Sequence, residues 1–253
     1  MLGGPLGALL GAALGHNFDK GMKSLPGAEQ FEAGDQERVQ TAFFTATFAV
    51  MGRVAKADGR VGPEEIRMAE AVMAEMSLAP EMRQTAIELF NQGKTADFDL
   101  EAVLSQFRRE CHGRSTLIGM FAEIQLQAAY ADGKLDPAED SLLQLICRRV
   151  GISEFDYRRL ERMVRAELGL GGKRQTGHRP TSAEALQAAY AVLGVSAQAS
   201  DAEVKRAYRR LLSQHHPDKL VSKGLPEEMM KVAAQKTHEI RQAYERVREM
   251  RGS

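Results

Sequence analysis

The chain has 253 residues, of which 43% are hydrophobic and 27% are charged, and Lys plus Arg equals Asp plus Glu at 34 each. This length allows two modest domains of about 100 to 200 residues each, and the composition excludes collagen-like, mucin-like and fully disordered chains. The two cysteines, Cys111 and Cys147, form no Cys-x-x-Cys pattern. The sequence therefore supports neither a disulfide-stapled secreted scaffold nor a cysteine-based zinc ribbon, and we predict no catalytic role for either cysteine.

The charge is unevenly distributed along the chain. Residues 166–253 carry 15 basic and 10 acidic side chains, whereas residues 1–165 carry 19 basic and 24 acidic ones. A basic C-terminal third suits nucleic acid, a membrane surface or an acidic protein partner. Composition alone does not distinguish among these three kinds of partner, so the distinction depends on the motifs.

The N-terminus is apolar, with no charged residue before Asp19. Fifteen helical residues reach about 22 Å, which is short of a hydrocarbon core of about 30 Å. A signal peptide requires a basic segment before its apolar run, and no basic residue precedes this run. Lys20 and Lys23 follow it instead, and they favour a cytoplasmic C-terminal side. We predict a short membrane helix over residues 1–18, and the alternative is a Gly-rich leader with no fixed structure.

Glycine recurs every fourth residue in this run and marks one face of the predicted helix. Such a stripe lets two helices approach closely in lipid, so we expect a homodimer through the membrane helix. The predicted dimer face consists of Gly3, Gly7, Gly11 and Gly15.

Residues 36–167 show a helical period of apolar side chains almost throughout, as in Phe44, Phe48 and Met51. A segment beginning Ala57-Asp58-Gly59 recurs 74 residues later as Ala131-Asp132-Gly133. Each copy lies between two amphipathic segments and carries a proline where the second helix begins. We expect a compact bundle of about seven helices.

The Asp-Gly repeat also matches the second half of a calcium-binding EF-hand loop. Its first half fails, because positions one and three fall on Val54 and Lys56, or on Ala128 and Tyr130, which leaves too few oxygen ligands for a tight site. A helix turn is the favoured interpretation and no cofactor is expected. The alternative is a weak or shared divalent site whose candidate ligands are Asp58, Glu65, Asp132 and Glu139.

Residues 168–180 form a predicted linker that is rich in glycine and basic residues. Two capping boxes follow, in which Thr181 pairs with Glu184 and Ser200 pairs with Glu203. They introduce a second unit over residues 181–253, with helices expected at about 183–193, 201–215 and 227–249. Apolar seams predict that the last two helices pack as an antiparallel hairpin.

The middle helix of this unit carries a basic face and ends in a distinctive turn. Its basic side chains form two pairs spaced four residues apart, away from the apolar seam: Lys205, Arg206, Arg209 and Arg210. The sequence His216-Pro217-Asp218 follows, and the proline is expected to end the helix. We therefore expect His216 and Asp218 in an exposed turn beside the basic face.

The order and spacing of these elements resemble a J domain. The matching segments are Tyr190 to Val195, Lys205 to Arg210, His216-Pro217-Asp218 and Gln235 to Tyr244. Residues 211–231 resemble the DjlA-type membrane co-chaperones in particular. The Asp-Gly repeat resembles their TerB-like domain, and the N-terminus is similar to their transmembrane segment. The chain thus reads as an all-α protein with a membrane helix, a TerB-like bundle and a J domain.

The resemblance implies a regulatory co-chaperone without enzymatic activity of its own. His216, Pro217 and Asp218, with the four basic residues, would dock on a DnaK-type chaperone and accelerate its ATP hydrolysis. A location in the cell inner membrane, in contact with its lipid and with the C-terminal domains facing the cytoplasm, is also implied. The resemblance also implies a link to envelope or capsule stress signalling through a phosphorelay.

Three other functions are alternatives to this one. A metal-dependent hydrolase at His215 and His216 lacks a partner set of ligands. Nucleic-acid binding lacks interleaved aromatic residues and a recognition-helix motif, so no nucleic-acid partner is expected. The principal alternative is a membrane-surface sensor whose TerB-like domain binds a divalent ion or an envelope partner.

Overall fold

The computed structural model describes residues 2–15, 35–57, 59, 63–76, 78–130, 133–169, 181–226 and 229–252. All regular secondary structure in these ranges is helical. The helices are α1 (Gly4–Gly15), α2 (Asp35–Ala55), α3 (Pro63–Glu75), α4 (Pro80–Gly93), α5 (Leu100–Glu110), α6 (Ser115–Ala129), α7 (Pro137–Val150), α8 (Glu154–Glu167), α9 (Ser182–Leu193), α10 (Asp201–Gln214), α11 (Pro217–Val221) and α12 (Met230–Arg251).

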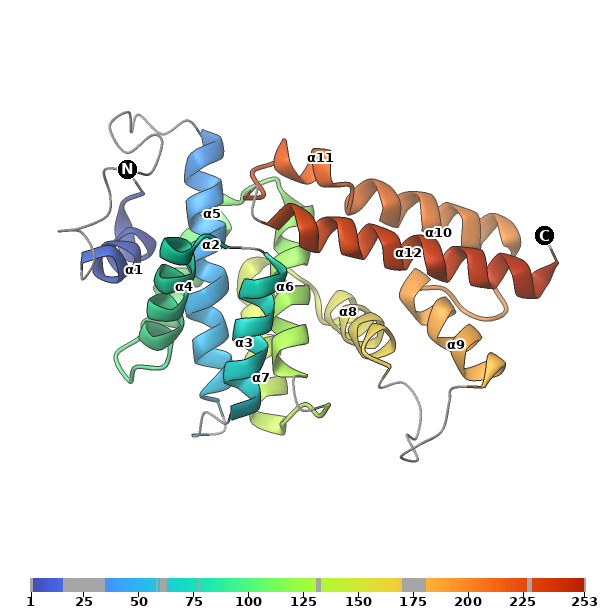
Figure 1. The fold of residues 1–253 in the computed structure, drawn as a ribbon, viewed down its shortest axis with the longest axis horizontal. Helices are drawn as coiled ribbons and strands as arrows, with labels where there is room; N and C mark the ends of the chain where they lie inside the picture. Colours follow the sequence, from blue (N-terminus) through green and yellow to red (C-terminus); the bar gives the residue numbers. More distant parts are fainter. Residues whose placement is uncertain are drawn as a thin grey trace.

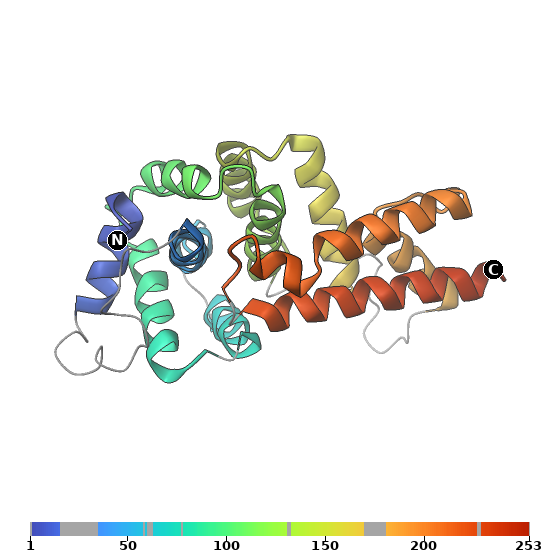
Figure 2. The same ribbon diagram turned by 90° about the horizontal axis from the view of Figure 1, so that it is seen from above.

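Helices α2 to α8 form the expected seven-helix bundle, with α2 at its centre (Figure 2). Fourteen of the 21 residues of α2 are buried, because its apolar and small side chains surround the helix rather than lining one face. Glycines bring α4 unusually close to α2. A Cβ added at Gly52 would lie 2.0 Å from the carbonyl oxygen of Phe90, and one added at Gly93 would lie 1.8 Å from that of Ala49.

Helices α9, α10 and α12 form a smaller core at the C-terminal end of the chain. Both expected capping boxes are present, at the start of α9 and at the start of α10. Helices α10 and α12 lie side by side (Figure 1) and run antiparallel, since Arg251 at the end of α12 pairs with Asp201 at the start of α10 at 2.7 Å. The rings of Tyr208 and Tyr244 stack between them with centroids 4.1 Å apart.

The C-terminal helices pack directly on the bundle. Helix α8 contacts α9, and the segment from α11 into α12 contributes fully buried side chains to the core of the bundle. Gln36 and Gln40 of α2 donate side-chain hydrogen bonds to the carbonyl oxygens of Val221 and Leu225. The buried residues of this segment are Leu220, Leu225, Met229 and Ala233.

Helix α1 lies against α2, α4 and α5 (Figure 1). Leu6 and Ala13 face the bundle and are buried. The buried side chain of Gln106 holds the first turn, because its amide donates to the carbonyl oxygen of Gly3 at 2.5 Å and its oxygen accepts from the amide of Leu6 at 2.9 Å. Among the described residues, no helix has both the length and the apolar character needed to cross a membrane.

Candidate functional site

The sequence His216-Pro217-Asp218 joins two helices. Gln214 is the last residue of α10, His216 is the N-cap of α11, and Pro217 is the first residue of α11. The side chains of His216 and Asp218 are 43% and 83% exposed, which confirms the expected exposed turn. Helix α11 is not predicted from the sequence, because a proline that ends one helix also has the φ angle required to begin the next.

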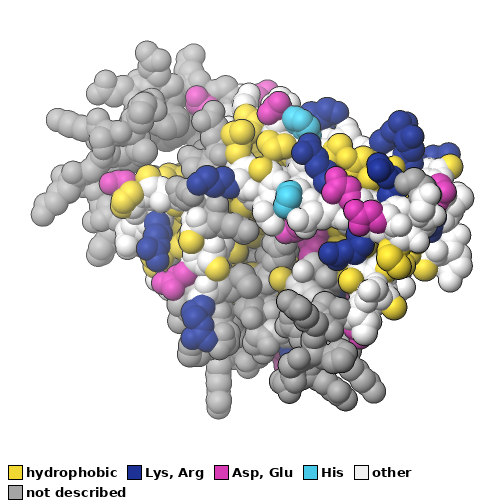
Figure 3. Space-filling view, turned by 45° about the vertical axis from the view of Figure 1, so that its right-hand side comes forward, with side chains coloured by type: hydrophobic (Ala, Val, Ile, Leu, Met, Phe, Trp, Pro, Cys, Tyr) yellow, Lys and Arg dark blue, Asp and Glu magenta, His cyan; other side chains and the backbone are white. Residues whose placement is uncertain are grey.

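The basic face of α10 is exposed as expected. Val204, Ala207 and Leu211 are buried, and this orientation turns Lys205, Arg206, Arg209 and Arg210 toward solvent. In Figure 3, Lys and Arg side chains gather on the side of the molecule formed by the C-terminal helices. The turn and the basic face are therefore presented together, next to the point where α10 meets the bundle.

A buried cluster of charged residues joins this site to the bundle. Lys236 of α12 contacts Glu167 of α8 at 2.6 Å and Glu123 of α6 at 3.4 Å. His215, immediately before the exposed turn, lies 3.9 Å from Glu123. All four side chains are less than 10% exposed. We call these four residues the junction cluster, and it fixes the base of the turn to α6 and α8.

The electrostatics of the junction cluster follow from its burial. Burial raises the pKa of Glu167 to about 7, against a smaller opposing effect of Lys236. Burial also lowers the pKa of His215, with Glu123 acting in the opposite direction. For Lys236, burial acts to lower the pKa, but the carboxylates of Glu123 and Glu167 together outweigh it and raise the pKa. Lys236 is therefore charged at any physiological pH.

The raised pKa of Glu167 predicts a pH-dependent stability. Between its ordinary value of 4.5 and its folded value of about 7, the folded chain binds more protons at this site than the unfolded chain. The contribution of Glu167 to stability therefore falls as the pH rises through that range. Glu167→Gln removes this contribution. When the pH rises from about 5 to about 7.5, the change in the free energy of unfolding is therefore expected to be more favourable for the variant than for the wild type.

The measurement is urea unfolding of both proteins at the two pH values. His215 acts in the opposite direction, because its lowered pKa makes stability fall as the pH drops below its ordinary value of 6.5. The difference between variant and wild type isolates Glu167, since both retain His215. Identical pH dependence in the two proteins would contradict the prediction.

Few features of the sequence indicate the junction cluster. Glu123 lies inside an otherwise apolar stretch of α6, and a carboxylate in that position was the one available signal. Glu167 and Lys236 are ordinary charged residues in amphipathic helices, 69 positions apart. Only the tertiary fold, in which α8 and α12 both pack against α9, brings them together.

The predicted glycine face of the N-terminal helix lies partly away from the bundle. Gly3 and Gly11 are exposed, and no atom lies within 4 Å of a Cβ added at either. A Cβ added at Gly7 would lie 1.8 Å from the carbonyl oxygen of Leu2, which precedes the helix. Gly15 is the last residue of α1. The use of this face for dimer formation stays a prediction.

The candidate divalent site is only partly visible. Asp58, Asp132 and the side chain of Glu65 lie outside the described residues. Glu139 completes a capping box at the start of α7, where it accepts a hydrogen bond from the amide of Asp136 at 3.1 Å. In the described part of the chain, no cluster of three or more His, Cys, Asp or Glu side chains has the arrangement of a metal site.

Both cysteines are buried in the core of the bundle. Burial raises the pKa of Cys111 to about 12 and that of Cys147 to about 12. The reactive thiolate form is therefore scarce at neutral pH. Cys111 also ends α5 as its C-cap, which accounts for its position just before the turn that leads to α6.

Comparison with known proteins covers the whole chain. Family models match the tellurite resistance protein TerB over residues 44–162, the DnaJ domain over 188–250 and the transmembrane domain of the co-chaperone DjlA over 1–25. The chain is 45% identical to the co-chaperone protein DjlA of Coxiella burnetii, covering 99% of this chain and 94% of that protein. It is 42% identical to that of Escherichia coli, covering 100% and 94%. No solved structure gives a significant match.

Proposed function

The chain belongs to the DjlA family of co-chaperones, and from that premise we propose that it docks on a DnaK-type chaperone and stimulates its ATP hydrolysis. The co-chaperone is not itself an enzyme, and its J domain implies a DnaK-type partner. The docking surface consists of the exposed turn and the basic face of α10: His216, Pro217, Asp218, Lys205, Arg206, Arg209 and Arg210.

The main support for this proposal is that the turn and the basic face share one accessible surface. Asp218 is 83% exposed, and the basic residues of α10 point to solvent beside it. Complementary charge between this face and an acidic surface of the chaperone would orient the encounter and speed it. The turn would then provide the specific contacts. Nothing in this arrangement requires a bound metal or cofactor.

The family match also indicates a membrane-anchored protein. The finer assignment is a single pass of the inner membrane with the C-terminal domains in the cytoplasm. Lys20 and Lys23 after the apolar run support it, as does the need to meet a chaperone that consumes ATP. The open space around Gly3 and Gly11 supports a homodimer through the N-terminal segment. A role in envelope or capsule stress signalling rests on the family resemblance.

The experiment is steady-state ATP hydrolysis by a DnaK-type chaperone in the presence of the full chain in detergent. The wild type is expected to accelerate hydrolysis, and His216→Gln is expected to return the rate to that of the chaperone alone, because the exposed imidazole of the turn is lost. The control is His112→Gln, which changes an exposed histidine at the end of α5. Equal stimulation by both variants would show that the turn is not the docking site.

A further inference from the structure

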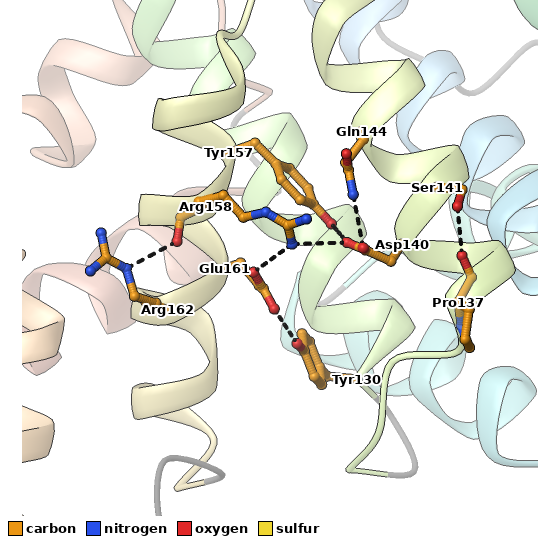
Figure 4. A network of polar contacts seen from close by, with 9 residues as sticks. All are labelled: Tyr130, Pro137, Asp140, Ser141, Gln144, Tyr157, Arg158, Glu161 and Arg162. Atoms are coloured by element: carbon orange, nitrogen blue, oxygen red, sulfur yellow. Dashed lines mark hydrogen bonds and ion pairs between the residues drawn. The ribbon is translucent and has the colours of Figure 1, made fainter.

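Helix α8 of the bundle presents two neighbouring arginines in different environments. Arg158 belongs to a polar network between α7 and α8 (Figure 4), in which it contacts Asp140 at 3.5 Å and Glu161 at 3.2 Å. Tyr157 and Tyr130 donate hydrogen bonds to the same two carboxylates. This network fixes the rotation of α8 on the bundle. The next residue, Arg159, consequently points to another side of the helix.

Arg159 lies where the bundle meets the J domain. It approaches the backbone at Gly194, where an added Cβ would lie 3.1 Å from Nε. It also lines a cavity of about 290 Å³ between α6, α8 and the end of α10, together with Gln214 and His215, the two residues before the exposed turn. Within the described residues, Arg159 forms no ion pair. Glu123 and Asp156 line the same cavity, but neither is within ion-pair distance of the Arg159 guanidinium, which lies beside the docking surface.

Arg210 of α10 is close enough to Arg159 to be affected by its charge. Partial burial lowers the pKa of Arg210, and the positive charge of Arg159 lowers it further. Arg210 likewise has no ion pair within the described residues. Two like charges that are held together by the fold gain from a shared negative partner, because one carboxylate would reduce the repulsion between them.

Phe155 adds an apolar contact on the same helix. It precedes Arg159 by four residues, so the two side chains lie on one face of α8. Three large hydrophobic residues are exposed among the described ones, and Phe155, at 73%, is the most exposed of them. An exposed aromatic side chain next to arginine is typical of the residues that dominate binding energy at protein interfaces.

We infer that Phe155 and Arg159 of the TerB-like bundle form a second part of the chaperone-docking surface, which adjoins the first part at Arg210. This part would receive an acidic segment of the DnaK-type chaperone that carries an apolar side chain. The inference rests on the proposed function and extends it, because it assigns part of the docking surface to the bundle rather than to the J domain alone. The bundle then contributes to partner choice as well as to anchoring.

The junction cluster makes this combined surface rigid. Lys236 is held by Glu167 of α8 at 2.6 Å, and Leu220 after the exposed turn is fully buried in the core of the bundle. The distance between Arg159 and the turn is therefore set by the fold. A chaperone meets both parts at once without ordering a flexible joint, and this preorganisation lowers the entropic cost of binding.

The test is a titration of the full chain in detergent against a DnaK-type chaperone, with the ATPase rate as the readout. Arg159→Glu is expected to raise the half-maximal concentration about fivefold to tenfold, corresponding to about 1 to 1.4 kcal/mol, without changing the rate at saturation. Phe155→Ser is expected to raise the half-maximal concentration in the same way. Raising the salt concentration is expected to weaken chaperone binding by the wild type more than binding by Arg159→Glu. The variant has already lost one of the attractions that salt screens.

The matched control is Arg83→Glu, which makes the same charge change on α4, separated from α8 by the central helix (Figure 2). Arg83 is exposed and its contact with Glu70 is a surface pair. Melting temperatures of all variants verify folding. If Arg159→Glu and Phe155→Ser both titrate like Arg83→Glu while His216→Gln loses stimulation, the inference is wrong and the proposed function stands. If the wild type does not stimulate hydrolysis, both the inference and the proposed function are wrong.

Discussion

Replacing Lys236 with methionine is expected to lower the free energy of unfolding by about 3 to 5 kcal/mol, because it leaves two carboxylates buried without their cation. Glu123 and Glu167 both face Lys236 and both have side chains that are at most 7% exposed. Methionine approximates the length of the lysine stem, so the loss reports the charge rather than a cavity. Urea unfolding of the full chain measures it.

The control for this prediction is Arg246→Met, which removes an exposed positive charge from the same helix. Its effect is expected to stay within about 0.5 kcal/mol. Adding Glu167→Gln to Lys236→Met removes one of the uncompensated carboxylates, and part of the stability is expected to return. A loss below about 1 kcal/mol in the single variant would mean that the junction cluster contributes little to holding the two domains together.

Gly52→Ala is expected to destabilise the bundle by about 3 kcal/mol, through overpacking at the contact between α2 and α4. The added Cβ would lie 2.0 Å from the carbonyl oxygen of Phe90, which is a backbone atom that moves only if the helices separate. Thermal unfolding measures the effect as a lower melting temperature.

Gly119→Ala is the control for this substitution. Gly119 also lies inside a helix, but no atom lies within 4 Å of its added Cβ. The alanine is therefore expected to stabilise α6 by about 0.5 to 1 kcal/mol, through helix propensity alone. The two glycine variants should shift the melting temperature in opposite directions. Equal shifts would show that α2 and α4 are not in close contact.

The sequence predicted the helices of this protein well because local signals define them. The capping boxes at Thr181 and Ser200 and the period of the buried residues depend on residues that are close in the chain. The exposed turn at His216 was predicted for the same reason. The start of α11 at Pro217 was missed, since five residues offer too short a pattern to read.

Contacts between segments that are distant in the chain could not be predicted from such local signals. The pairing of Lys236 with Glu123 and Glu167 depends on how three helices cross. The docking of α1 on the bundle depends on Gln106, about 100 residues away. Hydrophobic patterning shows which face of a helix is buried but not which neighbour covers it. The position of Arg159 beside Arg210 has the same origin.

The burial of Leu220, Leu225 and Met229 in the core of the bundle implies that the cooperative folding units of this chain do not coincide with its family boundaries. Amide hydrogens in the segment that follows the exposed turn would exchange with solvent only when the bundle opens, and not when the smaller core of α9, α10 and α12 opens. A fragment cut to the J domain alone would expose these three side chains to water. The turn that is proposed to dock on the chaperone thus takes its local stability from the TerB-like domain.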